Sequence, residues 1–418
     1  MASITPIVFF SNTGTTDADT TDTDLDRKTA ALANGIDYIV FYYANCGGSD
    51  TSAVPEMSIW FGDPASLLTG TRCGYVAAEG RGSGTDHWDS GQLQGVTMVT
   101  GDGTSVMGFS GRALVASDTS YFGAFGIVCI PTTEFSATVW FEGDNLNTEE
   151  LVNAETTQMN DVVSTTFADE SFAAGDYLVV MSMQAQIESA DVTGGYLADF
   201  TVDDVPINPV TMREEAEDTL DYMNCMAAEI LTLGAGTHTF KTRGQSQGAA
   251  TVDFSRSRIL VVKLTDVFDQ YVSTVQNSAE AVTATTYGTS AMCETTYTPN
   301  QQEYVFAIGT WTDFVNTTDV GVTRIVNTSD TTVFCEDAGE YLNNSASEDA
   351  GISAPFMCEQ ISAAKNYAVQ LRTAAGTATW GTGDVDSRLL FWGLTTSAAP
   401  PATAIRDVIG CGVVPFAR

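Results

Sequence analysis

Hydrophobic and polar residues alternate along most of this 418-residue chain, in short runs rich in Val, Ile, Thr, Tyr, Phe and Trp. Gly, Asp and Asn bound these runs, as in DYIVFYYA, YLVVMSMQA, YLADFTV and YAVQLRT. Alternation of period two between turn residues is typical of β-strands. Strands that recur at regular spacing favour antiparallel sandwiches or barrels over βαβ units. The pattern therefore predicts an all-β protein.

Two stretches carry a helical pattern instead. The stronger is TMREEAEDTLDYMNCMAAEILTL (211–233), where Thr211 is placed to cap an acidic first turn. The other is DRKTAALA (26–33). The sequence thus predicts few short helices in an otherwise antiparallel β fold.

The strand-like segments recur as a coarse repeat. Each copy opens with a strand that carries a tyrosine, at Tyr38, Tyr177 and Tyr304, and closes with YFGAFGIVCIP, SRSRILVVKL or DSRLLFWGL. Copies two and three match best, with Arg258 and Arg388 at matching positions in their closing segments. A unit of about 130 residues holds seven or eight strands, the size of a jelly-roll or immunoglobulin-like sandwich.

Three tandem units account for nearly the whole chain. We expect a first β-sandwich with an acidic N-terminal lead at 1–140, a second at 141–268 and a third at 269–398. The remaining residues, 399–418, are rich in Ala and Pro and then apolar. They predict an extended C-terminal arm that docks on a neighbouring domain or subunit.

The net charge of the chain excludes some classes of binding partner. Lys and Arg total 17 against 53 Asp and Glu, a net charge of −36. Such a field repels nucleic acid and anionic membranes, so neither is an expected partner. The start, MASITPIVFF, lacks the basic region of a signal peptide, and the longest apolar run, YFGAFGIVCI, is too short to cross a membrane. We expect synthesis in the cytoplasm and a partner with a basic face.

A serine-hydrolase-like motif occurs at GQSQG (244–248), next to His238. A nucleophile elbow needs a helix after the serine, and in α/β-hydrolases the catalytic histidine follows it. Here the strand-like AATVDFS follows, and no histidine comes later in the chain. The motif therefore predicts a hairpin turn, and the sequence predicts no catalytic residue and no enzyme.

No cofactor is predicted either. In TTDADTTDTDLD (15–26), alignment to an EF-hand loop places Arg27 where that loop needs Gly. A looser Ca²⁺ site at VDD (202–204) or GDNLN (143–147) stays open but has no further support. The eight cysteines form no C-x-x-C pair, and most are expected to be buried free thiols.

Two groups of residues are candidates for binding. Arginines crowd the end of the second repeat, and they either pair with nearby carboxylates or form an intersubunit contact with an acidic neighbour. Exposed tryptophans are candidates for glycan contacts, whereas Trp60, Trp140 and Trp392 lie in apolar runs and are expected in the core. The candidate interface residues are Arg243, Arg256, Arg258 and Arg388, and the candidate glycan contacts are Trp88 and Trp311.

The segment AGTHTFKTRG…GAATVDFSRSRILVVKL resembles a pattern common in virion proteins of tailed bacteriophages. There a β-sandwich ends with G-x-H-x-hydrophobic, a Gly-rich turn and an apolar strand. The match covers mainly residues 174–266, more loosely 303–394, and weakly the first unit. Decoration, spike and fibre proteins with such domains are often jelly-roll-like or tumour-necrosis-factor-like, and often trimeric.

The resemblance implies a non-enzymatic structural protein located in the virion. It would decorate or cement the capsid, or form part of a spike or tail fibre, by binding copies of itself and the major capsid or tail proteins. Apolar strand faces and the C-terminal arm would bury surface in these contacts. The alternatives are a carbohydrate- or receptor-binding adhesion protein, with host glycans as partners, and a jelly-roll major capsid protein.

Overall fold

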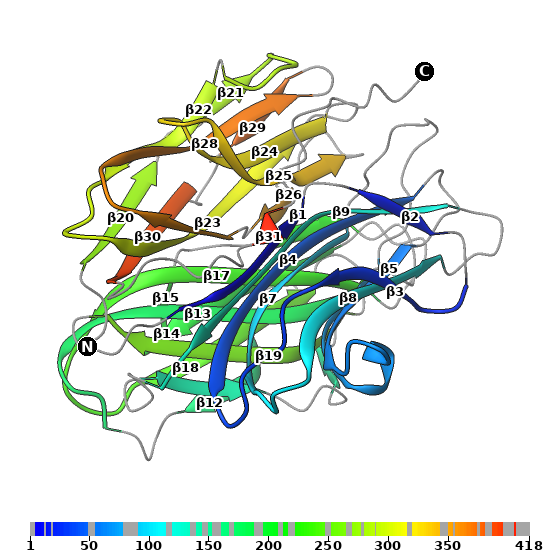
Figure 1. Cartoon of the computed structure of the whole chain (residues 1–418), viewed down its shortest axis with the longest axis horizontal. Coiled ribbons are helices and arrows are strands. Elements are labelled where there is room, and N and C mark those ends of the chain that lie inside the picture. The colour runs from blue at the N-terminus through cyan, green and yellow to red at the C-terminus, as the bar shows by residue number, and fades with distance from the viewer. Residues whose placement is uncertain are drawn as a thin grey trace.

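The structure is a computed structural model of the whole chain (Figure 1). It describes residues 5–11, 14–17, 20–48, 55–77, 91–113, 119–133, 139–143, 149–152, 160–166, 171–187, 195–207, 212–215, 222–246, 252–264, 270–276, 280–288, 290–315, 320–342, 350–353, 356–373, 377–380, 387–395 and 405–406.

The protein is all-β, as the sequence predicts. One turn of 3₁₀ helix, Leu67–Thr69, is the single helical element in the described ranges. Among the described strands, every pair is antiparallel except the pair of β1 (Ile7–Ser11) with the short strand near the C-terminus. The prediction of short α-helices at 211–233 and 26–33 is wrong, because these segments contribute strands β16 (Met212–Glu215), β17 (Tyr222–Leu233) and β3 (Thr23–Lys28).

Tertiary pairing explains the wrong helix prediction. β17 pairs antiparallel with β13 (Gly175–Ile187) along its whole length, from Tyr222 opposite Gln186 to Leu233 opposite Gly175. Met226 and Ala227 are both fully buried although they point to opposite faces of the strand. A strand that is apolar on both faces shows no period-two pattern. The helix propensity of Ala, Met and Leu therefore led to the wrong prediction of a helix.

The first unit is a sandwich of two four-stranded sheets. One sheet has the order β1-β9-β4-β7, and the other has the order β3-β8-β5-β6. Its strands are β1 (Ile7–Ser11), β2 (Thr15–Asp17), β3, β4 (Asp37–Gly48), β5 (Pro55–Gly62), β6 (Thr71–Ala77), β7 (Gly91–Thr100), β8 (Val106–Ala113) and β9 (Ser120–Pro131), with β2 beside β9.

The second unit repeats this order. Its sheets are β10-β19-β13-β17 and β12-β18-β14-β16. Its strands are β10 (Val139–Gly143), β11 (Glu149–Val152), β12 (Asn160–Thr166), β13, β14 (Gly195–Val202), β15 (Val205–Pro206), β16, β17, β18 (Thr239–Ser246) and β19 (Val252–Lys263).

The third unit has the same order again, in β20-β30-β23-β27 and β22-β28-β24-β25. Two sheets in the orders first-eighth-third-sixth and second-seventh-fourth-fifth are the connectivity of a jelly roll. Its strands are β20 (Gln270–Gln276), β21 (Glu280–Val282), β22 (Ser290–Tyr297), β23 (Glu303–Val315), β24 (Val320–Asn327), β25 (Thr332–Leu342), β26 (Ala350–Ser353), β27 (Phe356–Ile361), β28 (Lys365–Thr373), β29 (Ala378–Trp380) and β30 (Ser387–Thr395).

Backbone pairing also links the units. Tyr222 of β17 pairs with Ala77 of β6, which joins sheets of the first and second units into one nine-stranded sheet. At the C-terminus, β31 (Ile405–Arg406) pairs in parallel with Phe9 and Phe10 of β1. The expected unit limits, 1–140, 141–268 and 269–398, stay predictions, although β10 crosses the first of them and pairs with β19.

Each sandwich has a hydrophobic core of its own between its two sheets. These three unit cores contain, for example, Val40 and Phe109 in the first unit, Val179 and Phe240 in the second, and Phe391 in the third. Their side chains come from alternate positions of facing strands, as the period-two pattern predicts.

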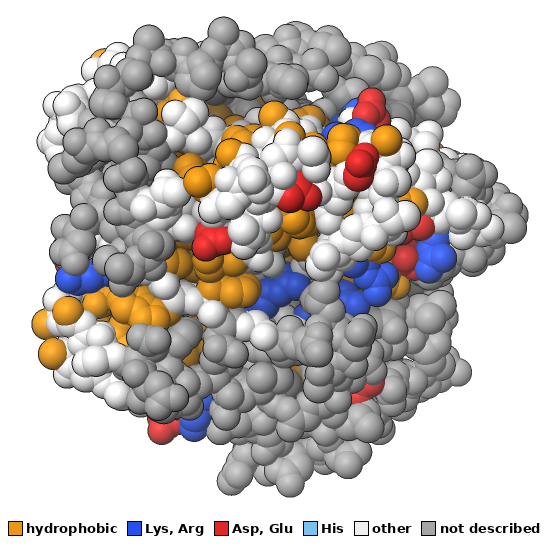
Figure 2. All heavy atoms as spheres, turned by 60° about the horizontal axis from the view of Figure 1, so that its bottom comes forward, with side chains coloured by type: hydrophobic (Ala, Val, Ile, Leu, Met, Phe, Trp, Pro, Cys, Tyr) orange, Lys and Arg blue, Asp and Glu red, His pale blue; other side chains and the backbone are white. Residues whose placement is uncertain are grey.

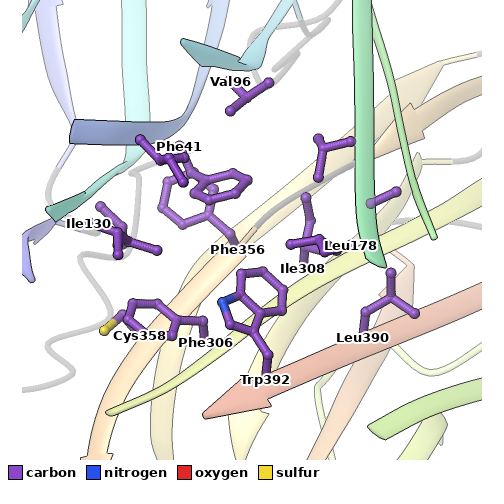
Figure 3. Packing of buried hydrophobic residues seen from close by; sticks show 14 of the residues in the cluster. Phe41, Val96, Ile130, Leu178, Phe306, Ile308, Phe356, Cys358, Leu390 and Trp392 are labelled. Carbon is purple, nitrogen blue, oxygen red and sulfur yellow. The ribbon is translucent and has the colours of Figure 1, made fainter. Parts of the chain in front are cut away.

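A fourth cluster, the central core, lies where the three units meet (Figure 3). It is built by the outward faces of β4, β7 and β9, of β13, β17 and β19, and of β23, β27 and β30. Phe41 of the first unit lies against Trp392 and Phe356 of the third, with ring centroids 6.0 and 6.1 Å apart. Leu178 and Leu260 bring in the second unit.

The central core corrects one expectation about assembly. The apolar faces of these strands, expected to bury surface against copies of the protein, are buried against other units of the same chain. The three jelly rolls therefore form one body around a shared core, and these strand faces are buried within the chain.

Candidate functional site at the junctions between units

Arg258 of β19 links the second unit to the first. Its side chain is buried, and its Nη1 donates a hydrogen bond to the Tyr42 hydroxyl at 2.9 Å and a longer one to the Val96 carbonyl at 3.4 Å. Tyr42 lies in the core of the first unit and donates in turn to the Cys73 carbonyl at 3.4 Å. The guanidinium therefore ties together strands β4 and β7 of the neighbouring jelly roll.

Arg388 makes the equivalent contact one unit later. It lies on β30, and its Nη1 forms an ion pair with Glu229 of β17 in the second unit. In both cases an arginine of a closing strand reaches the sixth strand of the preceding jelly roll. The matching positions of Arg258 and Arg388 in the sequence thus reflect a matching place in the fold.

Arg256 and Arg72 lie beside one aromatic ring at the first junction. The guanidinium carbon of Arg72, on β6, is 4.9 Å from the centroid of Tyr75, and that of Arg256 is 5.3 Å from it. Cation–π contact of this kind is attractive. Arg256 has a positive φ of 51° at an irregularity in the β13–β19 pairing, which places its side chain on this face. Burial first, then the charges of Arg72 and Arg258, lower the pKa of Arg256.

Amide side chains complete this junction. Gln94 donates to the Asn224 carbonyl at 2.9 Å, and Asn224 donates to the carbonyls of Tyr75 and Gln92 at 3.0 and 3.2 Å. Gln184 donates to the same Tyr75 carbonyl at 2.7 Å. These bonds satisfy backbone carbonyls of β6, β7 and β17 where the two units meet, as burial requires.

Arg243, the fourth predicted interface residue, lies elsewhere. It is on β18 and its Nε donates to Asp199 Oδ1 at 2.7 Å, with a second bond from Nη2 to the other carboxylate oxygen. Its neighbour Lys241 pairs with Asp204 at 2.8 Å. For Arg243 the structure shows pairing with a nearby carboxylate, one of the two hypotheses. An intersubunit role for the four arginines stays a prediction.

The first three residues of the serine motif, Gly244, Gln245 and Ser246, lie in strand β18, and the predicted hairpin turn falls outside the described residues. Ser246 ends β18 and pairs with Tyr196, while residues 247–251 are outside the described residues. His238 is held away from it, with Nδ1 2.6 Å from Asp203 and Nε2 3.0 Å from the Gly234 carbonyl. Burial lowers the pKa of His238, but the bonds to Asp203 and Gly234 outweigh burial and raise it. An imidazole whose two ring nitrogens are both held in hydrogen bonds is a poor general base.

The tryptophans divide into three groups. Trp88 lies outside the described residues, and for Trp311 the structure gives only its backbone, in β23 opposite Ser353. Both stay predicted glycan contacts. Trp392 is buried in the central core, and Trp140 is partly buried against the core of the second unit. Trp60 is half-buried on the outer face of β5, where it donates to Ser110 Oγ at 2.8 Å and lies 5.9 Å from Arg72, so its expected core position is wrong.

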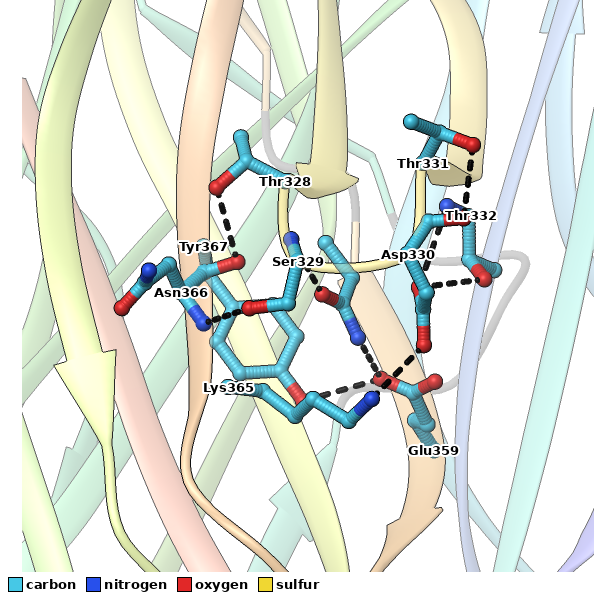
Figure 4. Close-up of polar contacts among 10 residues, drawn as sticks. Thr328, Ser329, Asp330, Thr331, Thr332, Glu359, Lys365, Asn366 and Tyr367 are labelled. Atoms are coloured by element: carbon cyan, nitrogen blue, oxygen red, sulfur yellow. Dashed lines mark hydrogen bonds and ion pairs between the residues drawn. The ribbon is translucent and has the colours of Figure 1, made fainter.

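A polar network closes one end of the third unit (Figure 4). Buried Glu359 accepts hydrogen bonds from Tyr367 and Asn327, both at 2.9 Å. Nearby, Lys365 pairs with Asp330 at 2.9 Å. Burial first, and then the Glu359 charge, raise the pKa of Tyr367. Because each buried group has its partner, this network holds the strand ends together rather than presenting reactive groups.

The described residues hold no cluster of three or more His, Cys, Asp or Glu side chains that could bind a metal ion. Within the Ca²⁺ candidate VDD, Asp203 and Asp204 bond to His238 and Lys241; most of GDNLN lies outside the described residues. Burial raises the pKa of the Cys73 thiol to about 11, and other free thiols are also buried. Over the same ranges, no helix is long and apolar enough to span a membrane.

Sequence reasoning found Arg256, Arg258 and Arg388 but missed Arg72 and Tyr75. Their segment, TRCGYVA, shows only a short strand. This segment matters because it forms β6, the edge strand that pairs with the second unit, and the order of strands in the sheet decides which strand lies at that edge.

On one face of the molecule, Lys and Arg side chains gather along a hollow next to hydrophobic side chains (Figure 2).

No protein-family model and no curated protein matches this sequence. Among solved structures, the chain is similar to one described as the triple jelly roll fold and turret assembly in an archaeal virus, with 9% identity, 94% of this chain and 92% of that chain covered, and a TM-score of 0.20. A structure of Sulfolobus Turreted Icosahedral Virus gives 9% identity, coverages of 90% and 86%, and a TM-score of 0.19. A structure of dimeric latent PorU from Porphyromonas gingivalis gives 8% identity, with 96% of this chain and 32% of that chain covered, and a TM-score of 0.24. Scores this low carry no argument about function.

Proposed function

We propose that the protein is a non-enzymatic structural component of a virus particle. The observation that carries the proposal is the central core, which fuses three jelly rolls into one body. A body of this kind provides broad rigid surfaces for assembly, and its net charge of −36 keeps it soluble at high concentration.

Within that role, we propose a tailed virus as the setting, with the protein decorating or cementing the capsid or forming part of a spike or fibre. The support is the resemblance of residues 174–266 to virion proteins of tailed bacteriophages. Self-association and contacts with capsid or tail proteins would be made by the outer sheets and the C-terminal arm, since the sheets around the central core are occupied. A trimer is the expected oligomer.

Purified particles test this function. We expect the chain to be present in washed particles at a fixed copy number, measured by gel densitometry against the major shell protein. Sedimentation velocity of the isolated chain over a concentration series should show an oligomer. A chain that stays monomeric at every concentration and is absent from particles would refute the proposal.

A jelly-roll major capsid protein is the second candidate, because the sheet orders of all three units are those of a jelly roll. The same densitometry separates the two roles. A copy number equal to that of the most abundant shell protein indicates the capsid itself, whereas a smaller stoichiometric number indicates decoration.

A receptor-binding role remains the third candidate and rests on Trp88 and Trp311. A glycan array on which binding disappears in Trp88→Ala and Trp311→Ala variants would favour it. No binding to any glycan by the intact chain would remove it.

A further inference from the structure

The first strand of each jelly roll lies at an edge of a sheet. These edge strands are β1, β10 and β20, in the equivalent orders β1-β9-β4-β7, β10-β19-β13-β17 and β20-β30-β23-β27. An edge strand presents backbone N–H and C=O groups that can pair with a further strand. Folded proteins therefore usually cover such an edge or place charged side chains along it.

Two of the three equivalent edges have one of these protections. The edge of the first unit is covered, because β31 pairs with Phe9 and Phe10 of β1. The edge of the second unit consists of β10 and β11, which both pair with β19 and contain Glu142, Glu149 and Glu150. Carboxylates along an edge disfavour pairing with another strand of this acidic chain.

The edge of the third unit differs from both. β20 has the sequence QYVSTVQ, without a charged residue, Pro or Gly, and its register with β30 is unbroken from Gln270 to Gln276. Among the described strands, β20 pairs with β30 alone, and it lies at the rim of the third unit (Figure 1). An uncharged, unbroken strand rich in β-branched residues is a template for pairing with another chain.

The side chains of β20 add to this signal. Val275 is 44% exposed and is one of two large hydrophobic residues exposed in the described ranges. Tyr271 and Val272 are partly buried, against the central core and the core of the third unit respectively. The two faces of this sheet are thus occupied within the chain, whereas no described strand covers its outer edge.

The sequence of β20 is complementary to itself in an antiparallel pair. With a two-fold axis at Ser273, Tyr271 lies opposite Val275 of the second copy, and Val272 lies opposite Thr274. Aromatic and β-branched residues form favourable cross-strand pairs, and no two charges face each other in this register. A contact in which both copies use the same surface is typical of two-fold dimers.

We propose that β20 of one copy pairs antiparallel with β20 of a second copy, so that the sheet β20-β30-β23-β27 continues across a two-fold axis at Ser273. The inference rests on the proposed self-association. Two copies that each carry −36 repel over most of their surfaces, and at this uncharged edge backbone hydrogen bonds form without bringing carboxylates together. A two-fold contact makes a dimer by itself, and it joins two trimers if another surface holds the expected trimer.

Disulfide formation tests the pairing and its register. Residues directly opposite each other in antiparallel strands have Cα atoms about 4.5–5.5 Å apart, which suits a disulfide. We expect an oxidised Ser273→Cys variant to form a covalent dimer on a non-reducing gel, far more than the wild type, whose described free thiols are buried. Val275→Cys is the matched control, because it is also exposed on β20 but its two copies would lie about 13 Å apart along the strands.

Charge substitutions at the same position measure the strength of the contact by sedimentation velocity over a concentration series. Ser273→Glu should associate about tenfold more weakly than the wild type, because two carboxylates then face each other. Ser273→Lys should also weaken the association, although it lowers the net charge, because two ammonium groups then meet. Val205→Glu is the control, since it adds a charge at an exposed site of the second unit and should associate as the wild type does.

Two further measurements accompany this series. Added NaCl should strengthen the association of the wild type, because salt screens the repulsion between two acidic copies. Thermal unfolding of each variant at the wild-type temperature would show that the loss of association does not come from misfolding, as expected for an exposed position such as Ser273.

The outcomes separate this contact from the proposed function. Equal crosslinking of Ser273→Cys and Val275→Cys would indicate random collision and would overturn the registered pairing. An oligomer that neither Ser273→Glu nor Ser273→Lys weakens would overturn the β20 contact and leave self-association to another surface. A chain that is monomeric at every concentration but present in particles at a fixed copy number would refute the β20 contact and leave the proposed function standing.

Discussion

Phe391 and Trp392 are neighbours on β30 but belong to different cores. Phe391 lies in the core of the third jelly roll, 5.2 Å from Tyr367 by ring centroids, and Trp392 lies in the central core, 5.8 Å from Phe306. The same division separates Val40 from Phe41 on β4. One face of each such strand is buried by its own unit, and the other face is buried only by the other units.

This difference makes the units mutually dependent. A single jelly roll could form its own core, but it would expose the apolar face of its second sheet to water. Monomeric proteins rarely tolerate exposed apolar patches above a few hundred Å². The central core therefore explains why three repeats occur in one chain, and it predicts different consequences for substitutions on the two faces.

Truncation of Trp392 should have the largest effect. Trp392→Ala removes a fully buried aromatic side chain from the central core, and we expect a loss of about 3–5 kcal/mol in the free energy of unfolding. Phe391→Ala should cost a similar amount. Denaturant unfolding measures both, and hydrogen exchange should separate them, with protection lost in β4, β13 and β23 for Trp392→Ala but mainly in the third unit for Phe391→Ala.

Thiol labelling of native cysteines can compare the stability of the central core with that of a unit core. Cys358 lies in the central core and Cys129 in the core of the first unit, and both are free and buried. In Trp392→Ala, thiol labelling of Cys358 should accelerate more than that of Cys129. Equal labelling of both sites in both variants would show that the chain unfolds as one cooperative unit and would contradict separable cores.

Much of this fold could be predicted from the sequence. Alternation predicted the strands, and the recurrence of Tyr38, Tyr177 and Tyr304 marked one equivalent strand in each unit. That strand was expected to open each unit, but the structure makes it the third strand of each jelly roll, because two earlier strands of the jelly roll precede it. The position of the central core could not be predicted from the sequence. The apolar face of a strand shows that it must pack against another element, but it does not show which element. The segment 222–233 was misjudged for the same reason, since burial on both faces removes the alternation that identifies a strand.

Arg258 should show the next largest effect. Arg258→Met keeps much of the side-chain volume but leaves the Tyr42 hydroxyl and the Val96 carbonyl without this donor, and we expect a loss of about 1–3 kcal/mol. A double-mutant cycle with Tyr42→Phe should give a coupling of about 1 kcal/mol. Stability equal to the wild type would mean that burying the charge costs as much as its hydrogen bonds contribute.

Arg388 should matter less, although its position is equivalent. Its partner Glu229 retains 21% side-chain exposure, so solvent weakens the ion pair. We expect Arg388→Met to cost about 1 kcal/mol, decreasing with added salt, whereas the cost of Arg258→Met should be insensitive to salt. Unfolding at low and high NaCl tests the contrast, and Glu229→Gln should reproduce the effect of Arg388→Met.

The candidate site was predictable only in part. Arg256, Arg258 and Arg388 drew attention because basic residues are rare in this chain. Arg72 carried no such signal, since its role depends on Tyr75 three residues along the same strand and on Arg256 across the junction. A contact between units is set by strand order, and strand order is a property of the whole chain.

The smallest effect should come from a pair on the periphery, far from both kinds of core. His238 has a raised pKa because its bonds to Asp203 and Gly234 outweigh burial. A raised pKa in the folded state contributes stability that is complete below the unfolded value of about 6.5 and is lost as the pH rises through the folded value. Because Asp203 is half exposed, we expect this pair to contribute under about 1 kcal/mol to the free energy of unfolding.

The variant His238→Gln tests this contribution. It should be less stable than the wild type at pH values below about 6, with the difference shrinking towards pH 8. A difference that grows with pH would show that the neutral ring is the stabilising form.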